Sequence, residues 1–367
     1  MTESKEAPVD SGPAVTRVLI IKVGALGDVI RTTSVLPGLS ARYPNLAVCW
    51  VTAPGARALI QHHPMIDEVE TLAIEDVDQV RRLAAKLSEG GPWDRVLSLD
   101  DELPMCELAS LLPCRALSGA TLDASGERVY TDDVAPWFEM GLLSRKGKES
   151  ADQLKIANRR THPELFASML GIEPGRPGLF LSEEVRAQTR AFADSSGLDE
   201  VRPLIGLSTG AGGRWRTKEL PVDRTVEMAR QIAAALDGAC SFLLLGGPDE
   251  LARSQAVLDG LRAVEPGVRV VDAGNDNDLL EFAARLELVD LLVSSDSMPL
   301  HMGIALQRKI VCFFAPTSAA EIELYGQGEK VWSTAPDYCS YLPDADNASI
   351  TPERLTEKVL QVLARSD

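Results

Sequence analysis

Asp28 is the first side chain in this sequence whose setting indicates chemistry. It follows a short β-branched run, Arg17 to Val23, and the glycines Gly24 and Gly27, and a helical pattern begins at this point. Because open α/β sheets bind ligands at the carboxyl ends of their strands, we expect Asp28 beside a cleft. A helix N-cap or a first-turn charge is an equally good interpretation. The glycine spacing departs from GxGxxG, so NAD binding has little support.

A glycine-rich segment in the second half of the chain indicates phosphate binding. Ser208 to Gly213 follows an apolar strand-like run, and three cations come directly after it: Arg214, Arg216 and Lys218. Backbone N–H groups and cations at such a turn can hold phosphate oxygens. The order is not the GxxxxGK[ST] of a P-loop, and a surface turn with incidental charges is the alternative interpretation.

Two further strand ends in the same half carry polar turns. In the turn from Gly246 to Glu250, the Glu250 carboxylate could accept hydrogen bonds from a ribose, whereas Asp249 suits a helix cap. The segment that ends at His301 opens a helix, so its amides and the Ser297 hydroxyl could hold a diphosphate. A lone helical histidine is usually structural, but His301 lies in the first turn at the predicted ligand edge.

Strands alternate with helices in both halves of the chain, and this pattern predicts parallel βαβ units in two doubly wound domains. The expected strands are 17–23, 47–52 and 95–99 in the first half, and 204–208, 241–245, 268–272, 291–294 and 310–314 in the second. We expect a disordered start over 1–16, domains over 17–185 and 186–345, and a final helix within 346–367. Polar turns in both halves predict a cleft between the domains, and suggest transfer of a group from an activated nucleotide to an acceptor.

The composition restricts the partners. The 367 residues carry 54 acidic and 37 basic side chains, a formal net charge of −17, so the mean field repels nucleic acid and anionic membranes. The basic stretch 137–170 is either a solvated helix face or a face that receives an anionic acceptor. The six cysteines form no CxxC pair, so neither a zinc knuckle nor a disulfide framework is indicated. No apolar window reaches the length of a membrane span, and we expect a cytoplasmic protein with at most peripheral membrane contact.

Three motifs, taken in order, resemble one known family. They are Lys22-Val-Gly-Ala-Leu-Gly-Asp28, Gly210-Ala-Gly-Gly-Arg-Trp-Arg-Thr-Lys218-Glu-Leu-Pro221 and Ser295-Asp-Ser-Met-Pro-Leu-His301. The sequence is similar to glycosyltransferase family 9, the heptosyltransferases, from about Arg17 to the last helix. The resemblance implies an α/β fold of the GT-B type, in which two Rossmann-like domains with doubly wound parallel sheets face a central cleft. The acceptor would bind the N-terminal domain and ADP-heptose or a related sugar nucleotide the C-terminal one. The last helix would pack back toward the N-terminal domain.

The resemblance also implies roles for single residues. Asp28 takes the position of the general base, and Lys218 a catalytic position at the donor phosphate. Glu250 matches a ribose contact. The expected donor-binding residues are Thr209, Gly210, Gly212, Arg216, Lys218, Gly247, Glu250, Asn277, Asp278, Asp296, Ser297, Met298 and His301, and the expected acceptor-binding residues are Lys22, Arg31 and Asp101. Met298 stands where the family usually has glycine, so the backbone approaches the phosphate less freely there.

The implied reaction is inversion without a metal ion or a further cofactor. A carboxylate takes the proton of the acceptor hydroxyl as that oxygen attacks the anomeric carbon, while cations and helix-start amides stabilise the leaving diphosphate. The sequence has no clear DxD pair, and Asp100 and Asp101 are adjacent residues of the acceptor half. The acceptor could be a lipopolysaccharide core, another glycan, a protein or a small natural product.

Three alternatives stay open on the sequence alone. A nucleotide-sugar epimerase would share the fold and act on its donor without an acceptor. A degenerate domain that serves as a scaffold or nucleotide sensor would show no turnover that depends on Asp28. A dehydrogenase would have to bind NAD(P), whose glycine motif the sequence does not match.

Overall fold

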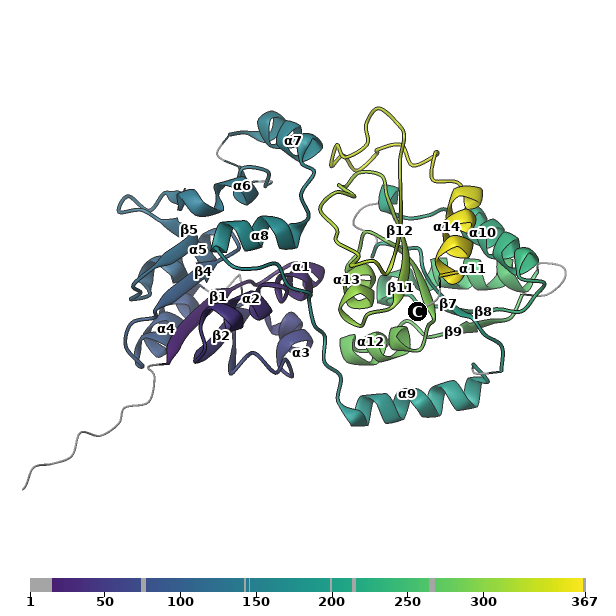
Figure 1. The fold of residues 1–367 in the computed structure, drawn as a ribbon, viewed down its shortest axis with the longest axis horizontal. Helices are drawn as coiled ribbons and strands as arrows, with labels where there is room; N and C mark the ends of the chain where they lie inside the picture. The colour runs from purple at the N-terminus through teal and green to yellow at the C-terminus, as the bar shows by residue number, and fades with distance from the viewer. Residues whose placement is uncertain are drawn as a thin grey trace, which may run out of the picture.

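The computed structural model describes residues 15–73, 77–141, 143–144, 146–198, 200–212, 216–263 and 268–365. The expected disordered start, 1–16, lies outside these ranges except for its last two residues. Arg145 and Arg214 also lie outside the described ranges. Two six-stranded sheets form two units that lie side by side (Figure 1).

The N-terminal sheet has the strand order β3-β2-β1-β4-β5-β6. Its strands are β1 (Thr16–Ile21), β2 (Leu46–Thr52), β3 (Glu68–Thr71), β4 (Arg95–Ser98), β5 (Leu117–Leu122) and β6 (Arg128–Tyr130). Its helices are α1 (Leu26–Thr32), α2 (Val35–Arg42), α3 (Arg57–Ile60), α4 (Val77–Ser88), α5 (Leu103–Leu111), α6 (Ala135–Phe138), α7 (Lys148–Ala157) and α8 (His162–Leu170), with short 3-10 turns η1 (Pro54–Ala56) and η2 (Asp132–Val134). All pairs are parallel except the antiparallel pair of β5 and β6. The central β1 is buried from Val18 to Ile21, as a strand covered on both faces must be, and it delivers the next residues to the carboxyl edge.

The C-terminal sheet is parallel throughout, in the order β12-β11-β10-β7-β8-β9. Its strands are β7 (Leu204–Ser208), β8 (Ser241–Leu244), β9 (Val270–Asp272), β10 (Leu291–Ser295), β11 (Lys309–Phe314) and β12 (Gly328–Trp332). Its helices are α9 (Glu183–Ser196), α10 (Val222–Ala235), α11 (Leu251–Arg262), α12 (Leu279–Glu287), α13 (Met298–Ala305) and α14 (Pro352–Leu363), with 3-10 turns η3 (Arg216–Lys218) and η4 (Pro248–Glu250). Helix α9 packs on α12 of this domain. The predicted fold class, two doubly wound and mostly parallel sheets, is confirmed.

The position expected for the last helix is wrong. Helix α14 packs on α10, β11 and β12 of its own domain and does not return to the N-terminal one (Figure 1). Its buried face, Leu355, Val359 and Val362, belongs to the same apolar core as Met228 and Ile232 of α10. The amphipathic stripe of α14 is therefore already covered within the C-terminal domain.

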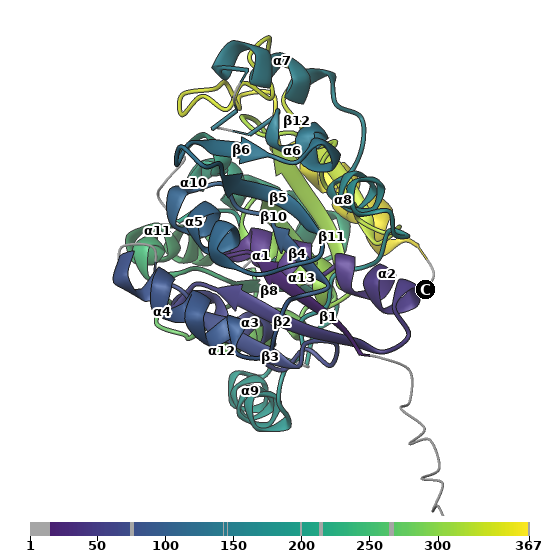
Figure 2. The same ribbon diagram turned by 90° about the vertical axis from the view of Figure 1, so that its left-hand side faces the viewer.

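The two domains meet where α1 packs against α13 and α3 against α12. A β-carbon at Gly27 would lie 2.5 Å from His301 Cδ2, closer than two carbon atoms approach without repulsion. Glycine at this position therefore lets the two helices come together. Figure 2 and Figure 1 both show α7 and the segment after β12 together at one end of the molecule, although they belong to different domains. None of the helices within the described ranges has the length and apolar composition needed to cross a membrane.

Candidate active site

A cavity of about 840 Å³ lies between the two domains and is lined by residues of both. The lining includes nine of the residues singled out from the sequence: Lys22, Asp28, Arg31, Asp101, Lys218, Asp296, Ser297, Met298 and His301. Eight predicted donor-binding residues lie outside that lining: Thr209, Gly210, Gly212, Arg216, Gly247, Glu250, Asn277 and Asp278. Carboxylates and cations from opposite domains thus line one open cleft.

Asp28 lies in the first turn of α1, but it does not cap the helix. The N-cap position belongs to Ala25, and the Asp28 Oδ1 atom instead lies 2.9 Å from Arg31 Nε. The Asp28 side chain is 35% exposed, so it remains accessible from the cavity. Burial on its own would raise the pKa of Asp28, but Arg31, Lys22 and His301 outweigh it and hold the pKa below its ordinary value. The carboxylate is therefore ionised at neutral pH.

Lys22 and Asp100 form a buried ion pair beneath this turn. Asp100 also accepts hydrogen bonds from the backbone N–H groups of Val23 and Gly24, so it fixes the segment between β1 and α1. Asp101 accepts a hydrogen bond of 2.9 Å from the Tyr130 hydroxyl, and burial raises its pKa. Lys22 and Asp101 both line the cavity, but each already has a partner from this domain.

Lys218 and Asp296 form the corresponding pair on the C-terminal wall. The Lys218 Nζ atom lies 2.9 Å from the Asp296 carbonyl oxygen and 3.1 Å from its Oδ2. Burial opposes ionisation of Asp296, but Lys218 and His301 lower its pKa to about 2. His301 is itself buried in α13, and burial, reinforced by Arg31, lowers its pKa to about 4. The histidine is therefore neutral at pH 7.

The N-terminus of α13 faces the same cavity. Its N-cap residue Ser297 makes no side-chain capping bond, and its hydroxyl instead contacts Ser295 Oγ at 2.9 Å. Met298, the first residue of the helix, lies on the cavity wall. The positive end of the α13 dipole is therefore directed at the cavity, as the sequence predicted for this strand-to-helix turn.

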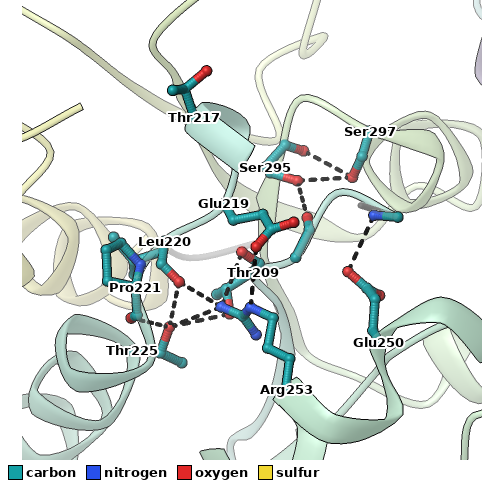
Figure 3. A network of polar contacts seen from close by, with 12 residues as sticks. Thr209, Thr217, Glu219, Leu220, Pro221, Thr225, Glu250, Arg253, Ser295 and Ser297 are labelled. Atoms are coloured by element: carbon teal, nitrogen blue, oxygen red, sulfur yellow. Dashed lines mark hydrogen bonds and ion pairs between the residues drawn. The ribbon is translucent and has the colours of Figure 1, made fainter. Parts of the chain in front are cut away.

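Glu250 joins two glycine turns beside the cavity (Figure 3). Its carboxylate accepts a hydrogen bond from Gly212 N at 3.2 Å and another from Gly247 N at 3.0 Å. A β-carbon at Gly210 would lie 1.7 Å from Glu250 Oε1, so this close approach requires glycine. The side chain thus holds the glycine-rich loop in place, a function that the spacing of the motif did not predict.

The remaining predicted donor residues have local structural partners. Asn277 Nδ2 donates to the carbonyl oxygens of Ala273 and Gly274 at 3.0 Å. Asp278 is the N-cap of α12 and accepts from two backbone N–H groups of that helix. The Thr209 hydroxyl is buried, whereas Arg216 is exposed. Their contact with a nucleotide stays a prediction.

Sequence reasoning missed a cluster that crosses the cleft. Glu321, from the segment after β11, lies 3.9 Å from Arg31 Nη1 and accepts a hydrogen bond of 3.2 Å from the Tyr341 hydroxyl. The Arg31 guanidinium also lies 5.1 Å from the centroid of the Trp137 ring, and Lys155 Nζ lies 3.9 Å from that of Tyr341. Glu321 and Tyr341 occupy segments without a motif, so no sequence signal singled them out. Trp137 and Lys155 belong to the basic stretch 137–170, and both line the cavity.

A backbone hydrogen bond strengthens this bridge between the domains. The His162 N–H, at the start of α8, donates to the Glu321 carbonyl oxygen at 2.8 Å. Within the described ranges, no group of three or more His, Cys, Asp or Glu side chains is arranged to hold a metal ion.

Two mostly parallel sheets that face one cavity are the arrangement of the GT-B fold. The chain belongs to glycosyltransferase family 9 (heptosyltransferase), whose sequence profile matches residues 133–343, more than half of the chain. The expected resemblance is confirmed, and the protein is a glycosyltransferase of the heptosyltransferase type.

The relatives and solved structures agree with this assignment. Lipopolysaccharide heptosyltransferase 2 of Salmonella typhimurium is 24% identical, over 95% of this chain and 99% of the relative. Lipopolysaccharide heptosyltransferase 1 of Escherichia coli K12 is 24% identical, over 86% of this chain and 92% of the relative. Among solved structures, a glycosyltransferase of family 9 from Veillonella parvula has a TM-score of 0.76 at 19% identity, covering 97% of this chain and 100% of its own. The ADP-heptose lipopolysaccharide heptosyltransferase II of Escherichia coli has a TM-score of 0.65 at 20% identity, covering 95% and 98%. These two structures are similar to this chain in fold.

Proposed function

We propose that this protein transfers a heptose from ADP-heptose to a hydroxyl of a lipopolysaccharide core or a related glycan, with inversion at the anomeric carbon. The observation that carries the proposal is the shared cavity. It presents an ionised carboxylate, Asp28, from one domain, and Lys218 with the N-terminus of α13 from the other. The names of the relatives, which refer to lipopolysaccharide and to ADP-heptose, support the substrate classes.

In the proposed reaction Asp28 accepts the proton of the acceptor hydroxyl. The bond from that oxygen to the anomeric carbon forms as the bond from the anomeric carbon to the diphosphate oxygen breaks, and ADP leaves with the electron pair. Asp28 can fill this role because it is ionised, and so able to accept a proton, and because its side chain is partly exposed to the cavity. Arg31 holds the carboxylate in place.

The C-terminal wall would stabilise the leaving group. Lys218 can take up the negative charge that develops on the diphosphate, provided that it exchanges Asp296 for a phosphate oxygen. The positive end of the α13 dipole would add to this stabilisation. We therefore propose that no metal ion and no cofactor beyond the donor is required. We also propose a cytoplasmic location, with membrane contact limited to the periphery.

Product analysis tests the proposal. The purified protein is incubated with ADP-heptose and a deacylated lipopolysaccharide-core acceptor in the presence of EDTA, and products are resolved by mass spectrometry and NMR. We expect ADP and a heptosylated acceptor with an inverted anomeric configuration. A changed sugar nucleotide formed without acceptor would instead identify an epimerase. Turnover that EDTA abolishes and magnesium restores would overturn metal independence.

A further inference from the structure

Arg253, on α11, lies beneath the glycine-rich loop that runs from Thr209 to Leu220 (Figure 3). Its Nη2 atom donates to Thr209 Oγ1 at 2.9 Å, to the Thr209 carbonyl oxygen at 3.2 Å and to the Leu220 carbonyl oxygen. The Thr225 hydroxyl lies 3.4 Å from the same nitrogen. One guanidinium therefore contacts both ends of the loop.

The two ends of the loop are also joined to each other. Leu220 N donates to the Thr209 carbonyl oxygen at 2.9 Å, and the Thr209 and Thr225 hydroxyls lie 3.2 Å apart. Further along, Ser295 Oγ donates to the Gly210 carbonyl oxygen. The two described parts of the loop, 209–212 and 216–220, are thus joined at Thr209 and Leu220, and Lys218 in the second part contacts Asp296.

The electrostatic setting of Arg253 argues against a purely stabilising role. Its side chain is 16% exposed, and its nearest carboxylate, that of Glu219, is 3.9 Å from Nε. Burial lowers the pKa of Arg253, although Glu219 and Glu250 oppose the shift. A guanidinium held mainly by carbonyl and hydroxyl oxygens costs desolvation energy, so such groups are weak contributors to stability. Its fixed planar geometry, in contrast, is well suited to tie two distant points of backbone together.

We propose that Arg253 is a positioning residue for donor binding: it ties Thr209 to Leu220 so that Lys218 meets the diphosphate of the sugar nucleotide. The proposal rests on the proposed function, because it takes Lys218 to be a donor-phosphate contact. Arg253 itself does not line the cavity and acts through the loop.

Calorimetric titration with ADP tests the role of Arg253. The Arg253→Lys variant keeps the charge but loses the planar group, and we expect ADP affinity to fall by about tenfold or more. The matched control is Arg230→Lys, on the exposed face of α10, where within the part of the chain that the structure describes the arginine pairs only with Glu227. The ADP affinity of this variant should stay within about twofold of wild type. In steady-state assays the KM for the donor should rise and the KM for the acceptor should not. Equal ADP affinity of wild type and Arg253→Lys would overturn the proposal.

A double-mutant cycle separates positioning from loss of fold. If Arg253 acts by placing Lys218, Arg253→Lys should weaken ADP binding less than about twofold in a Lys218→Ala background, because interacting residues give non-additive effects. Additive losses would overturn the proposal. If Arg253→Lys does not fold, Thr209→Val replaces it in the double-mutant cycle, because this variant removes one oxygen that Arg253 contacts. The proposal then requires the same non-additive effect with Lys218→Ala. Failure of the wild type to bind ADP would overturn the donor assignment itself, whereas wild-type binding that Arg253 does not influence would overturn only this inference.

Discussion

Adding one methyl group at the domain interface should separate the two halves of the active site. In Gly27→Ala, the new β-carbon would lie 2.5 Å from Cδ2, 3.3 Å from Nε2 and 3.4 Å from Cγ of His301. Carbon atoms in contact are about 3.5 to 4.0 Å apart, so either the ring or one of the helices must move by about 1 Å. Because α1 and α13 belong to opposite domains, we expect the domains to move apart.

The size of the effect follows from the cost of overpacking. Forcing a methyl group into a well-packed contact costs about 1 to 3 kcal/mol, which corresponds to roughly a 5- to 150-fold loss of the closed arrangement. The kcat/KM for transfer should fall by a factor in that range. Loss of the helix cannot explain such a fall, because alanine favours a helix more than glycine does.

Two measurements check this prediction. Small-angle X-ray scattering or a distance between fluorophores on the two domains should show a more open protein, and steady-state kinetics should show the lower kcat/KM. Gly55→Ala is the matched control, since no atom lies within 4 Å of its added β-carbon. In the double variant Gly27→Ala/His301→Ala the closed separation should return. A Gly27→Ala protein with unchanged kcat/KM and domain separation would refute the reasoning.

Three further predictions concern charge. Asp28→Asn should lower kcat by about 10²- to 10⁴-fold without changing the ADP affinity. The control is Asp223→Asn, which changes an exposed aspartate in the first turn of α10. Near-normal turnover of Asp28→Asn would exclude Asp28 as the base. Lys218→Ala should weaken ADP binding roughly 10- to 100-fold in calorimetry, and equal affinity would show that the lysine contacts only Asp296. His301 has a folded pKa of about 4 against an ordinary 6.5, so the unfolded chain binds more protons between these values and stability falls as pH drops through that window. The free energy of unfolding, measured with urea, should fall between pH 7 and pH 5, and this fall should be about 2 kcal/mol larger in wild type than in His301→Gln. An equal fall in the two proteins would contradict the burial of a neutral imidazole.

The sequence predicted the central strands of both sheets because each is buried on both faces. Such strands read as short continuous apolar runs, and β1, β2, β4, β7, β8, β10 and β11 all do. The strands that were not predicted, β3, β5, β6 and β12, are half-buried or lie at or next to a sheet edge. These strands lack the apolar run on which the prediction depended. The edge strand β9 was nevertheless predicted, over 268–272, because it contains Val270 and Val271.

The candidate site was predictable only where a strand end positions a side chain. Asp28 and Asp296 follow β1 and β10 at the carboxyl edges, and topology alone brings those edges to one cleft. Glu321 and Tyr341 reach the same cavity from irregular segments, whose paths depend on long-range packing. The prediction that α14 packs back toward the N-terminal domain was wrong for a related reason. An amphipathic pattern shows that a helix has a buried face, but it does not show which domain covers that face.

The contacts of Arg31 connect the two events that the proposed reaction needs. Its Nε lies 2.9 Å from Asp28 in the same helix, while its Nη1 lies 3.9 Å from Glu321 of the opposite domain. The carboxylate of Glu321 is buried, and burial raises its pKa while Arg31 opposes the shift. Separation of the domains would take Glu321 away from Arg31, and it would take His301, one of the groups that lower the pKa of Asp28, away from α1. If Asp28 is the base, its proton affinity therefore depends on Arg31 and Lys22 of its own domain and on His301 and Asp296 of the other, and it takes its final value when the domains meet.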